Sequence, residues 1–447
     1  MPEGPDLPRD QEEVANGVLR RLSLGLGARG TRWMVVGAAI AALGAYLFQA
    51  LGTRALGGVG YAPIGALWTI QYLIVSVVLL PIETHIARES ILSHAAGVRS
   101  PRVSFARLWG WLALVAILAS SVCWLLRDEL FEGLDDLALV VGALVLSYGA
   151  FLIVRGRLAG TERFKAYGVV TASESTVRAV LAAVVTGFAP SVRAFAWIMP
   201  LGAFAAAGWW VPLRRNPRRP RDVAARPAEP PRTARFLALT TAANAITQLL
   251  LAGGPLLLAF LHAMPEEVSV FFVTATAVRV PLLFAFGGVL SRLLPVFMRL
   301  ESSDRRRESR AVAVKIALGT VSVAVVIGGV AAAVGGPLVA VLFGAAFRPP
   351  WWLAAGATVG VLLATGSIVL YQLLIARGSA GLGLLAWAVA LAAAVLAVVL
   401  TDGSATARAV VGLLTGEGVA LIALVLAASM AAGTTPRGDA GQRADVL

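Results

Sequence analysis

The residues of this 447-residue chain with the clearest potential for chemistry are ionisable side chains inside long apolar segments. Glu174 and Arg178 stand four residues apart in TASESTVRAV, so they lie on one helix face and can pair. Two hypotheses stay open: a self-neutralising structural pair, or a cavity wall where Glu174 exchanges a proton and Arg178 holds an anion. Glu417 is the other acidic residue well inside an apolar segment. Glu174 and Glu417 are therefore the ion-coupling candidates.

Arg279, in VTATAVRVPLL, has no acidic residue within a helical turn. An ionised group near the centre of a bilayer costs roughly 2.5 to 3.5 kcal/mol, so an unpaired cation needs an anion or water. The planar guanidinium fits phosphate oxygens, and we expect Arg279 to line a substrate cavity. The alternative is a distant partner such as Glu417 or Glu174. Arg292 lies nearer the inner surface and is expected to reach lipid headgroups.

A polar stripe follows the seventh apolar segment. Thr240, Asn244 and Gln248 recur every four residues, which gives a stripe about 12 Å long on a helix. It predicts a cavity wall that hydrogen-bonds sugar hydroxyls, or else hydrogen bonds between helices. Weaker substrate-binding candidates of the same kind are Gln71, Tyr72, Tyr371 and Gln372.

Motifs for catalysis or for metal binding are missing from the sequence. Its three histidines are isolated and no HExxH occurs, so a metal site is not indicated. GLGARG at 25 to 30 matches GxGxxG, but no strand precedes it and an apolar segment follows directly, which does not fit a dinucleotide-binding fold. Cys123 is the only cysteine, which excludes an intramolecular disulfide. We expect no enzymatic activity, no cofactor and no metal.

The elements that must position these residues are apolar helices. Hydrophobic residues make up 58% of the chain, charged residues 14%, and the mean hydropathy is +0.80. A spanning helix needs roughly 20 apolar residues. The sequence predicts an all-α polytopic membrane protein with about twelve transmembrane helices in two six-helix lobes. These lie near 33–52, 63–82, 107–126, 136–154, 167–188, 193–213, 236–261, 267–298, 311–334, 351–375, 382–400 and 407–431.

The basic residues occupy alternate gaps between the apolar segments. Of 38 Lys and Arg, 30 fall in the gaps assigned to the inner side and five in the outer gaps. This asymmetry places both termini in the cytoplasm by the positive-inside rule. It also accounts for the net charge of +13 without nucleic acid as a partner. Only two of the 38 are lysine, which fits a high-GC bacterial coding bias and a bacterial cytoplasmic membrane.

A proline- and arginine-rich stretch divides the chain into two halves, as in transporters built from two repeats. The predicted divisions are a cytoplasmic N-terminal segment 1–31, an N-lobe 32–213, a basic linker 214–235, a C-lobe 236–431 and a cytoplasmic tail 432–447. Two GxxxG spacings are predicted to mark tight helix contacts. They are Gly356 with Gly360 and Gly412 with Gly416.

Three segments carry a resemblance to a known family: FQALGTRALGGVGYAPIGALW at 48–68, MPEEVSVFFVTATAVRVPLLFAFGGVLSRLLPVF at 264–297 and LVAVLFGAAFRPP at 338–350. Over residues 30–431 the chain resembles the polysaccharide and oligosaccharide-lipid flippases of the MOP superfamily, which also holds lipid II flippases and MATE exporters. The resemblance implies two bundles around a cationic cavity with Arg279 and Arg178 as its cations. The turn LGGVGYAPIG lacks the acidic residue common in that region of the family.

The resemblance implies a flippase that moves a lipid-linked oligosaccharide, a polyprenyl-diphosphate glycan, across the membrane by alternating access. Partners would be that glycan lipid, membrane lipids and glycosyltransferases or a polymerase, with the transporter itself a monomer. A MATE-like multidrug or cation antiporter is the first alternative and predicts an acidic cavity in the N-terminal half. A non-transporting scaffold for a glycan synthase is the second and predicts no cavity.

Overall fold

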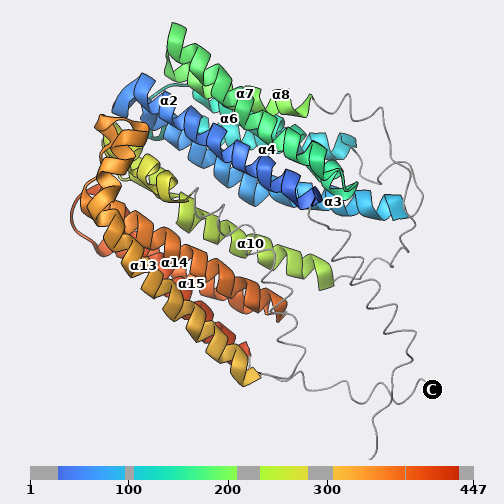
Figure 1. Ribbon diagram of the computed structural model, residues 1–447, viewed down its shortest axis with the longest axis vertical. Helices are drawn as coiled ribbons and strands as arrows, with labels where there is room; N and C mark the ends of the chain where they lie inside the picture. The colour runs from blue at the N-terminus through green and yellow to red at the C-terminus, as the bar shows by residue number, and fades with distance from the viewer. Residues whose placement is uncertain (1–28, 96–104, 209–231, 280–305, 378, 432–447) are drawn as a thin grey trace, which may run out of the picture.

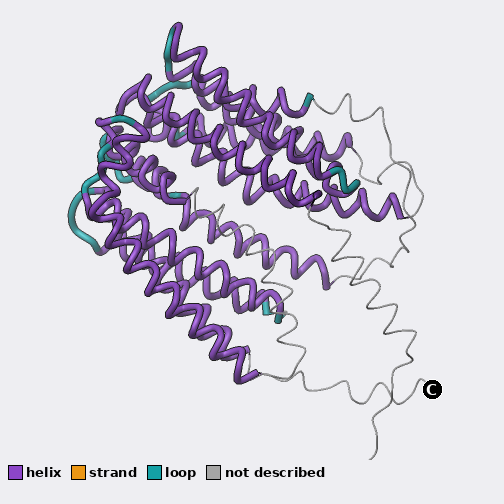
Figure 2. The backbone as a smooth tube through the Cα atoms, in the orientation of Figure 1, coloured by secondary structure: helices purple, strands orange, loops and turns teal. Residues whose placement is uncertain are grey.

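Every described segment of the chain is helical or a short connection, with no strand, in the computed structural model (Figure 2). Eight helices in that part of the chain are long and apolar enough to cross a bilayer, or nine if one bent pair forms a single span. The all-α, multi-pass membrane architecture is thus confirmed, while the count of twelve spans and the cytoplasmic termini stay predictions. The structure describes residues 29–95, 105–208, 232–279, 306–377 and 379–431.

The first bundle, called the N-lobe below, contains the helices coloured blue to green in Figure 1. Within it α2 packs along α7, and α6 packs against α3, α4 and α8. Its helices are α2 (Arg29–Leu73), the π-helix η1 (Ile74–Leu79), α3 (Leu80–Ala95), α4 (Phe105–Leu125), α5 (Arg127–Phe131), α6 (Asp136–Gly160), α7 (Phe164–Phe188) and α8 (Val192–Ala207).

The second bundle, the C-lobe, contains the remaining helices, with α13, α14 and α15 side by side and α10 running between the two bundles (Figure 1). α10 and α11 meet at a bend of 69°. The elements are α10 (Arg232–Ala252), α11 (Gly254–Phe260), a helix over 265–279, α13 (Arg306–Phe343), the 3-10 turn η2 (Ala345–Phe347), α14 (Trp351–Ala376), α15 (Ala380–Leu400) and α16 (Ala405–Ala431).

The helices extend further than the predicted apolar segments. The predicted gap 53–62 is helical, and a single residue, Gly57, breaks α2 with φ of 70° and ψ of −177°. α13 continues to Phe343, past the predicted end at 334. α10 begins at Arg232, inside the predicted linker, whose residues up to 231 lie outside the described part of the chain. Helices run on because backbone groups in lipid must be paired within the segment.

The glycine spacings mark tight helix contacts, as predicted. A Cβ on Gly356 of α14 would lie 2.5 Å from Val410 Cγ1 of α16, and a Cβ on Gly412 of α16 would lie 2.5 Å from Val398 Cγ2 of α15. The second glycine of each pair lies equally near its neighbouring helix, with contacts of 2.7 and 3.0 Å. The small residues therefore let α14, α15 and α16 approach closely. Such close packing stabilises contacts between helices in lipid, where the hydrophobic effect does not drive helices together.

The two lobes are joined beside the break in α2. Arg54 Nη2 donates to the carbonyl oxygen of Val341 at 2.6 Å, and Ser269 Oγ donates to that of Gly58 at 2.7 Å. The Tyr61 ring meets Phe347 edge-on with 6.2 Å between centroids. In Figure 1 the bundles converge at this end, on the left, and diverge toward the other.

The contact between α2 and α7 gives a test of the packing. A Cβ on Gly168 would lie 2.2 Å from the carbonyl oxygen of Trp33, a backbone atom that cannot move aside. Gly168→Ala is expected to lower stability by about 1 to 3 kcal/mol, the usual effect of overpacking. Gly187→Ala on the same helix is the control, because its Cβ would have no atom within 4 Å. Equal melting temperatures of the two variants in detergent would contradict this packing.

Candidate functional site

Arg279 lies at the boundary between the lobes, at the end of the helix over 265–279, with 6% of its surface exposed. Its Cζ lies 4.6 Å from the centroid of the Tyr72 ring of α2, and Tyr46 is a second electrostatic neighbour. Within the described residues, neither a carboxylate nor a hydrogen-bond acceptor pairs with this guanidinium. It is a buried cation compensated only by aromatic faces, an interaction worth roughly 0.5 to 2 kcal/mol.

A chain of hydrogen bonds leads from Tyr72 along the predicted polar stripe. Tyr72 Oη donates to Gln248 Oε1 at 2.8 Å, and Gln248 Nε2 donates to Asn244 Oδ1 at 3.3 Å. Asn244 Nδ2 then donates to the carbonyl oxygen of Ser76 in η1 at 3.1 Å. The stripe therefore faces the N-lobe, next to the partner of Arg279. We call Arg279, Tyr46, Tyr72, Asn244 and Gln248 the interlobe site.

Tyr46 is a member of the interlobe site that sequence spacing did not indicate. Its hydroxyl donates to the carbonyl oxygen of Ala277 at 3.0 Å, so α2 is tied to the turn that carries Arg279. Its ring also packs on Phe343 of α13 with 6.3 Å between centroids. Nothing in the sequence near Tyr46 signals this role, because its partners are more than 200 residues away.

Irregular backbone flanks the interlobe site on both sides. The π-helix η1 starts directly after Leu73, and Ser76 Oγ in it donates back to the carbonyl oxygen of Tyr72 at 2.6 Å. On the C-lobe side, α10 ends before Gly253, and a Cβ on Gly254 would lie 2.3 Å from the Phe271 ring. Interrupted helices at membrane depth occur where protein or a cavity covers them, and both of these breaks lie beside the interlobe site.

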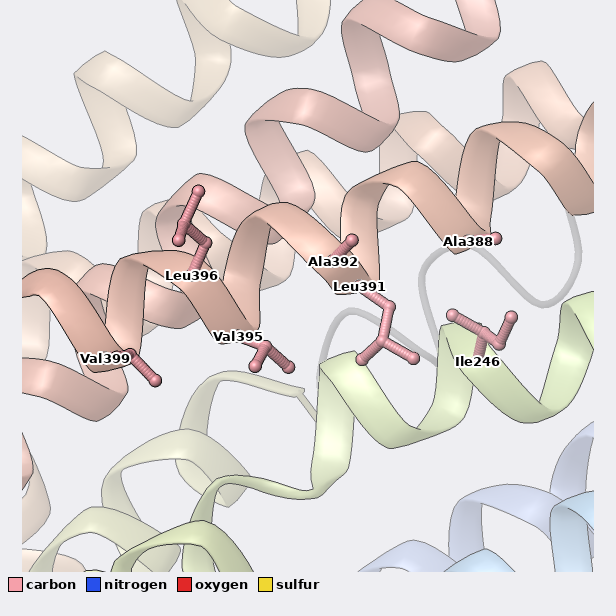
Figure 3. A pocket seen from close by; sticks show the side chains of 7 residues that line it. All are labelled: Ile246, Ala388, Leu391, Ala392, Val395, Leu396 and Val399. Carbon is pink, nitrogen blue, oxygen red and sulfur yellow. The ribbon is translucent and has the colours of Figure 1, made fainter.

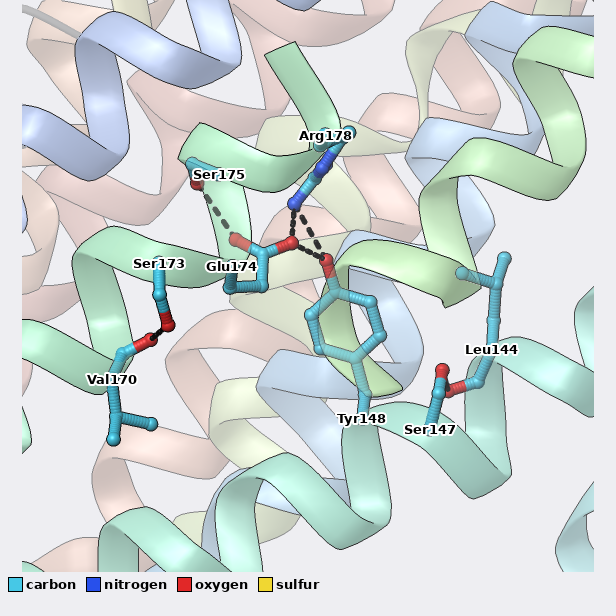
Figure 4. Close-up of polar contacts among 8 residues, drawn as sticks. All are labelled: Leu144, Ser147, Tyr148, Val170, Ser173, Glu174, Ser175 and Arg178. Atoms are coloured by element: carbon cyan, nitrogen blue, oxygen red, sulfur yellow. Dashed lines mark hydrogen bonds and ion pairs between the residues drawn. The ribbon is translucent and has the colours of Figure 1, made fainter. Parts of the chain in front are cut away.

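Glu174 and Arg178 form a buried cluster inside the N-lobe, in which Arg178 Nε and Nη1 have no hydrogen-bond partner among the described residues (Figure 4). Arg178 pairs with Glu174 and donates from Nη2 to Tyr148 Oη at 2.7 Å. Tyr148 Oη donates to Glu174 Oε1 at 2.5 Å, and Ser175 Oγ donates to Oε2 at 2.7 Å. The Arg178 guanidinium also lies 4.7 Å from the Trp68 ring. These are the surroundings of a self-neutralising pair; a cavity role for either residue stays a prediction.

Glu417 on α16 is fully buried, and neither of its carboxylate oxygens has a hydrogen-bond partner in the described chain. No ion pair joins Arg279 to Glu417 or to Glu174 among those residues, so the distant-partner alternative gains no support. An ionised carboxylate without donors is costly in apolar surroundings, and such groups take up a proton instead.

The other predicted residues lie apart from Arg279 or beyond the described chain. Tyr371 belongs to the C-lobe core, with its ring against Gly383 of α15 and its hydroxyl buried, and Gln372 beside it is half-buried. Thr240 is half-buried one turn before Asn244 on α10. Arg292 lies outside the described residues. A substrate role for these residues stays a prediction.

An apolar groove of about 490 Å³ lies on the opposite side of α10, between α10 and α15 (Figure 3). Ile246, which stands between Asn244 and Gln248 in the sequence, points into it. α10 therefore has a polar face toward the N-lobe and an apolar face toward this groove. The remaining lining residues are Ala388, Leu391, Ala392, Val395, Leu396 and Val399.

The described helices form two bundles that are joined at one end and have polar residues between them. No protein-family model matches the chain. An inward-facing structure of a multidrug resistance MATE family transporter of the MOP superfamily aligns with a TM-score of 0.59 and 16% identity, over 89% of this chain and 94% of that one. A Vibrio cholerae MATE transporter aligns with a TM-score of 0.54 and 15% identity, over 91% and 97%.

A further structural neighbour is a MOP superfamily transporter from Pyrococcus furiosus with a binding pocket of reversed polarity. It aligns with a TM-score of 0.51 and 14% identity, over 90% of this chain and 95% of that one. In sequence, the chain is 28% identical over 348 residues to the uncharacterized protein Rv3630 of Mycobacterium tuberculosis, covering 74% of this chain and 77% of the relative. The chain thus has the fold of MATE transporters of the MOP superfamily.

The paired and unpaired arginines should respond differently to substitution. Arg178→Gln is expected to cost about 3 to 5 kcal/mol of stability, because it leaves Glu174 as an uncompensated buried charge. The double variant Glu174→Gln with Arg178→Gln should recover most of this loss. Arg279→Gln should keep or raise the melting temperature, since it removes a cation with no anion beside it. A loss for Arg279→Gln as large as that for Arg178→Gln would contradict the assignment.

Glu132 and Glu266, two acidic residues at the joined end, predict that separation of the lobes depends on pH. Burial, and then the charge of Glu266 from the C-lobe, raise the pKa of Glu132, which follows α5 in the N-lobe. Separation of the lobes would remove the charge of Glu266 and lower this pKa toward its ordinary value, so the joined state binds more protons. Between the raised and the ordinary pKa of Glu132, a fall in pH should favour the joined state of the lobes. A rise in pH over the same range should favour their separation. The distance between a spin label near Glu132 and one near Glu266, in a Cys123→Ala background, measures the separation of the lobes.

Glu132→Gln is the control for the pH experiment, because it removes the titrating carboxyl and should flatten the response. An unchanged pH dependence in that variant, or separation of the lobes as the pH falls, would contradict the role of Glu132.

Proposed function

We propose that the chain is a membrane transporter that moves a lipid-linked oligosaccharide with a polyprenyl-diphosphate anchor across the membrane by alternating access. The observation that carries the proposal is Arg279: a buried guanidinium between two lobes, without an anion among the described residues. A cation is maintained at such a site at a cost of roughly 2.5 to 3.5 kcal/mol. A diphosphate that enters between the lobes would offset this cost.

The interlobe site supports recognition of both parts of such a headgroup. The guanidinium can bind two phosphate oxygens at once, because its planar fork of donors matches the spacing of those oxygens. Asn244 and Gln248 now hydrogen-bond to each other and to the N-lobe. These amides have donors and acceptors that sugar hydroxyls could take over, and Tyr72 offers an aromatic face to a sugar ring.

The polyprenyl chain has no need to enter the protein interior. Large hydrophobic side chains are exposed on the helices of both lobes, and the groove beside Ile246 lies on the face of α10 opposite the polar stripe. In this proposal the diphosphate and sugars pass between the lobes while the tail stays in lipid. The fold neighbour with reversed pocket polarity supports the idea that this fold serves substrates of different charge.

The arrangement of the lobes supports an inward-facing state. The hydrogen bonds of Arg54 and Ser269 close the end that holds the break in α2. The arginine distribution assigns that end to the outside. The alignment with an inward-facing MATE transporter agrees with this assignment. Rocking of the lobes about the site would then open the outer end and close the inner one.

Glu174 and Glu417 are the proposed ion-coupling residues of the transport cycle. Glu417 has no donor in the described chain, which fits a protonated acid in this state. Glu174 is compensated by Arg178 and fits the ionised form. A cation antiporter would need an acidic site open to substrate, and the pairing of Glu174 with Arg178 speaks against that alternative.

A flipping assay in liposomes tests the proposal. The probe is a short-chain polyprenyl-diphosphate N-acetylglucosamine with a fluorescent sugar, and external quencher reports its transfer between leaflets. Arg279→Gln should reduce the rate roughly 10- to 100-fold, the effect of losing a charged hydrogen bond. Arg348→Gln, at an exposed position outside the interlobe site, is the control and should flip at the wild-type rate.

The outcomes separate the three functions. Wild-type flipping that is lost in Arg279→Gln and kept in the control supports the flippase. Uptake of an organic cation such as ethidium by wild type, without lipid flipping, would overturn it in favour of a multidrug antiporter. Neither activity, together with synthase activity that depends on the chain but not on Arg279, would favour a scaffold.

A further inference from the structure

A second ionic cluster lies in the N-lobe, where Glu83 of α3, Arg155 of α6 and Tyr167 of α7 meet. Arg155 Nη2 lies 3.3 Å from Glu83 Oε1, and Tyr167 Oη donates to the same oxygen at 3.1 Å. Arg155 also hydrogen-bonds to Tyr167. A Cβ on Gly156 would lie 2.6 Å from the carbonyl oxygen of Glu83, so the absence of a side chain there lets α3 approach α6. We call Glu83, Arg155 and Tyr167 the inner cluster.

The inner cluster is incompletely satisfied and reaches the surface. Glu83 Oε2 and Arg155 Nε are buried without a hydrogen-bond partner among the described residues. The Arg155 side chain is 20% exposed, whereas those of Glu174 and Arg178 are 7% and 3% exposed. Of the two clusters, only the inner one has direct contact with the outside of the lobe, at the end assigned to the cytoplasm.

The inner cluster and the cluster around Glu174 lie along the same seam between α6 and α7. Tyr148 and Arg155 are seven residues apart on α6, and Tyr167 and Glu174 are seven apart on α7. Two helical turns separate such residues, so both pairs share a face with about 10 Å between the clusters. The ring of Phe151 contacts both Tyr148 and Arg155, which agrees with this placement.

Two side chains occupy the interval between the clusters. The Phe151 ring lies edge-on to Tyr148, with 5.9 Å between centroids, and 5.3 Å from Arg155 Cζ. Thr171, one turn from Tyr167 and one from Glu174 on α7, has a buried hydroxyl without a partner in the described chain. Buried hydroxyls without a protein partner are usually satisfied by ordered water.

We propose that the seam between α6 and α7 is a proton path that connects Glu174 to the cytoplasm through Thr171 and the inner cluster. This inference rests on the proposed transport function and names its coupling ion as the proton. The groups that face Glu174 are Tyr148 from α6, Arg178 and Ser175 from its own helix, and Gln71 through Tyr148 from α2. Those that face Glu83 are Arg155 and Tyr167.

The transfer requires no group outside this set except water. Glu174 takes up a proton when the outer end is open, and its O–H bond breaks in the inward-facing state. The proton then passes through water beside Thr171 to the carboxylate of Glu83, which leaves Glu174 ionised beside Arg178. Glu83 then releases the proton to solution beside Arg155. Each carboxylate lies beside an arginine, Glu174 beside Arg178 and Glu83 beside Arg155. The negative charge inside the lobe is therefore compensated before and after the transfer.

The ion pairs could also serve only to hold the helices together. The hydroxyl of Thr171 distinguishes this structural role from a proton path. Ion pairs hold α3, α6 and α7 together whether or not a hydroxyl lies between them. A proton path needs that hydroxyl. Thr171→Val keeps the shape of the side chain and removes only the hydroxyl, so it should leave the fold intact.

The test measures proton entry into sealed liposomes that contain the full chain and the pH dye pyranine, driven by a potassium potential with valinomycin. No lipid-linked sugar is needed. Wild type should conduct protons above protein-free liposomes, and Thr171→Val should reduce this flux about tenfold, the factor for losing one hydrogen bond in the relay. Thr171→Ser should restore it. Thr176→Val, at an exposed position of α7, is the matched control and should conduct as wild type.

Equal proton flux in Thr171→Val and wild type would overturn the path, as would wild-type flux no higher than in protein-free liposomes. Because the assay follows protons alone, its result is separate from that of lipid flipping. Loss of flipping in Arg279→Gln with unchanged flux in Thr171→Val would keep the flippase and reject the proton path.

Discussion

The cost of holding an ionised side chain in apolar surroundings governs the arrangement of this molecule. Glu174 with Arg178, and Glu83 with Arg155, meet that cost by pairing and by hydrogen bonds from tyrosine. Arg279 has only aromatic faces beside it in the described chain. The pairs lie within one lobe, where they connect neighbouring helices. The unpaired cation lies between the lobes, where a substrate and a change of conformation can reach it.

The backbone irregularities follow the same division. Helices inside each lobe pack through glycines and run without interruption, because lipid offers no partners for backbone groups. The breaks at Gly57 and Gly253 and the π-helix η1 all lie where the lobes meet or beside the interlobe site. Rigid lobes with irregular joints are what a rocking movement requires. The Arg54 and Ser269 bonds across the joined end are few and exposed or half-buried, so they can exchange with water.

The sequence predicted the features that depend on local spacing. The four-residue interval predicted the pair of Glu174 and Arg178. For the stripe on α10 the structure shows the alternative expectation, a hydrogen bond between helices from Asn244, while its contact with sugars stays a prediction. The sequence did not predict the inner cluster, because Glu83 and Arg155 lie just past the ends of the predicted apolar segments 63–82 and 136–154. Nor did it place Tyr46, whose contacts depend on how helices 200 residues apart pack. Such proximity comes from tertiary packing and leaves no periodic signal.

The most direct measurement of the central claim is binding at Arg279. Melting temperatures of the purified protein would be compared with polyprenyl diphosphate, with the uncharged polyprenol of equal length, and without lipid. A ligand that binds the native state stabilises it in proportion to the logarithm of its concentration over Kd. We expect diphosphate to stabilise wild type well above polyprenol, and Arg279→Gln to respond equally to both. An equal response of wild type to both lipids, or a diphosphate effect that persists in Arg279→Gln, would contradict the account.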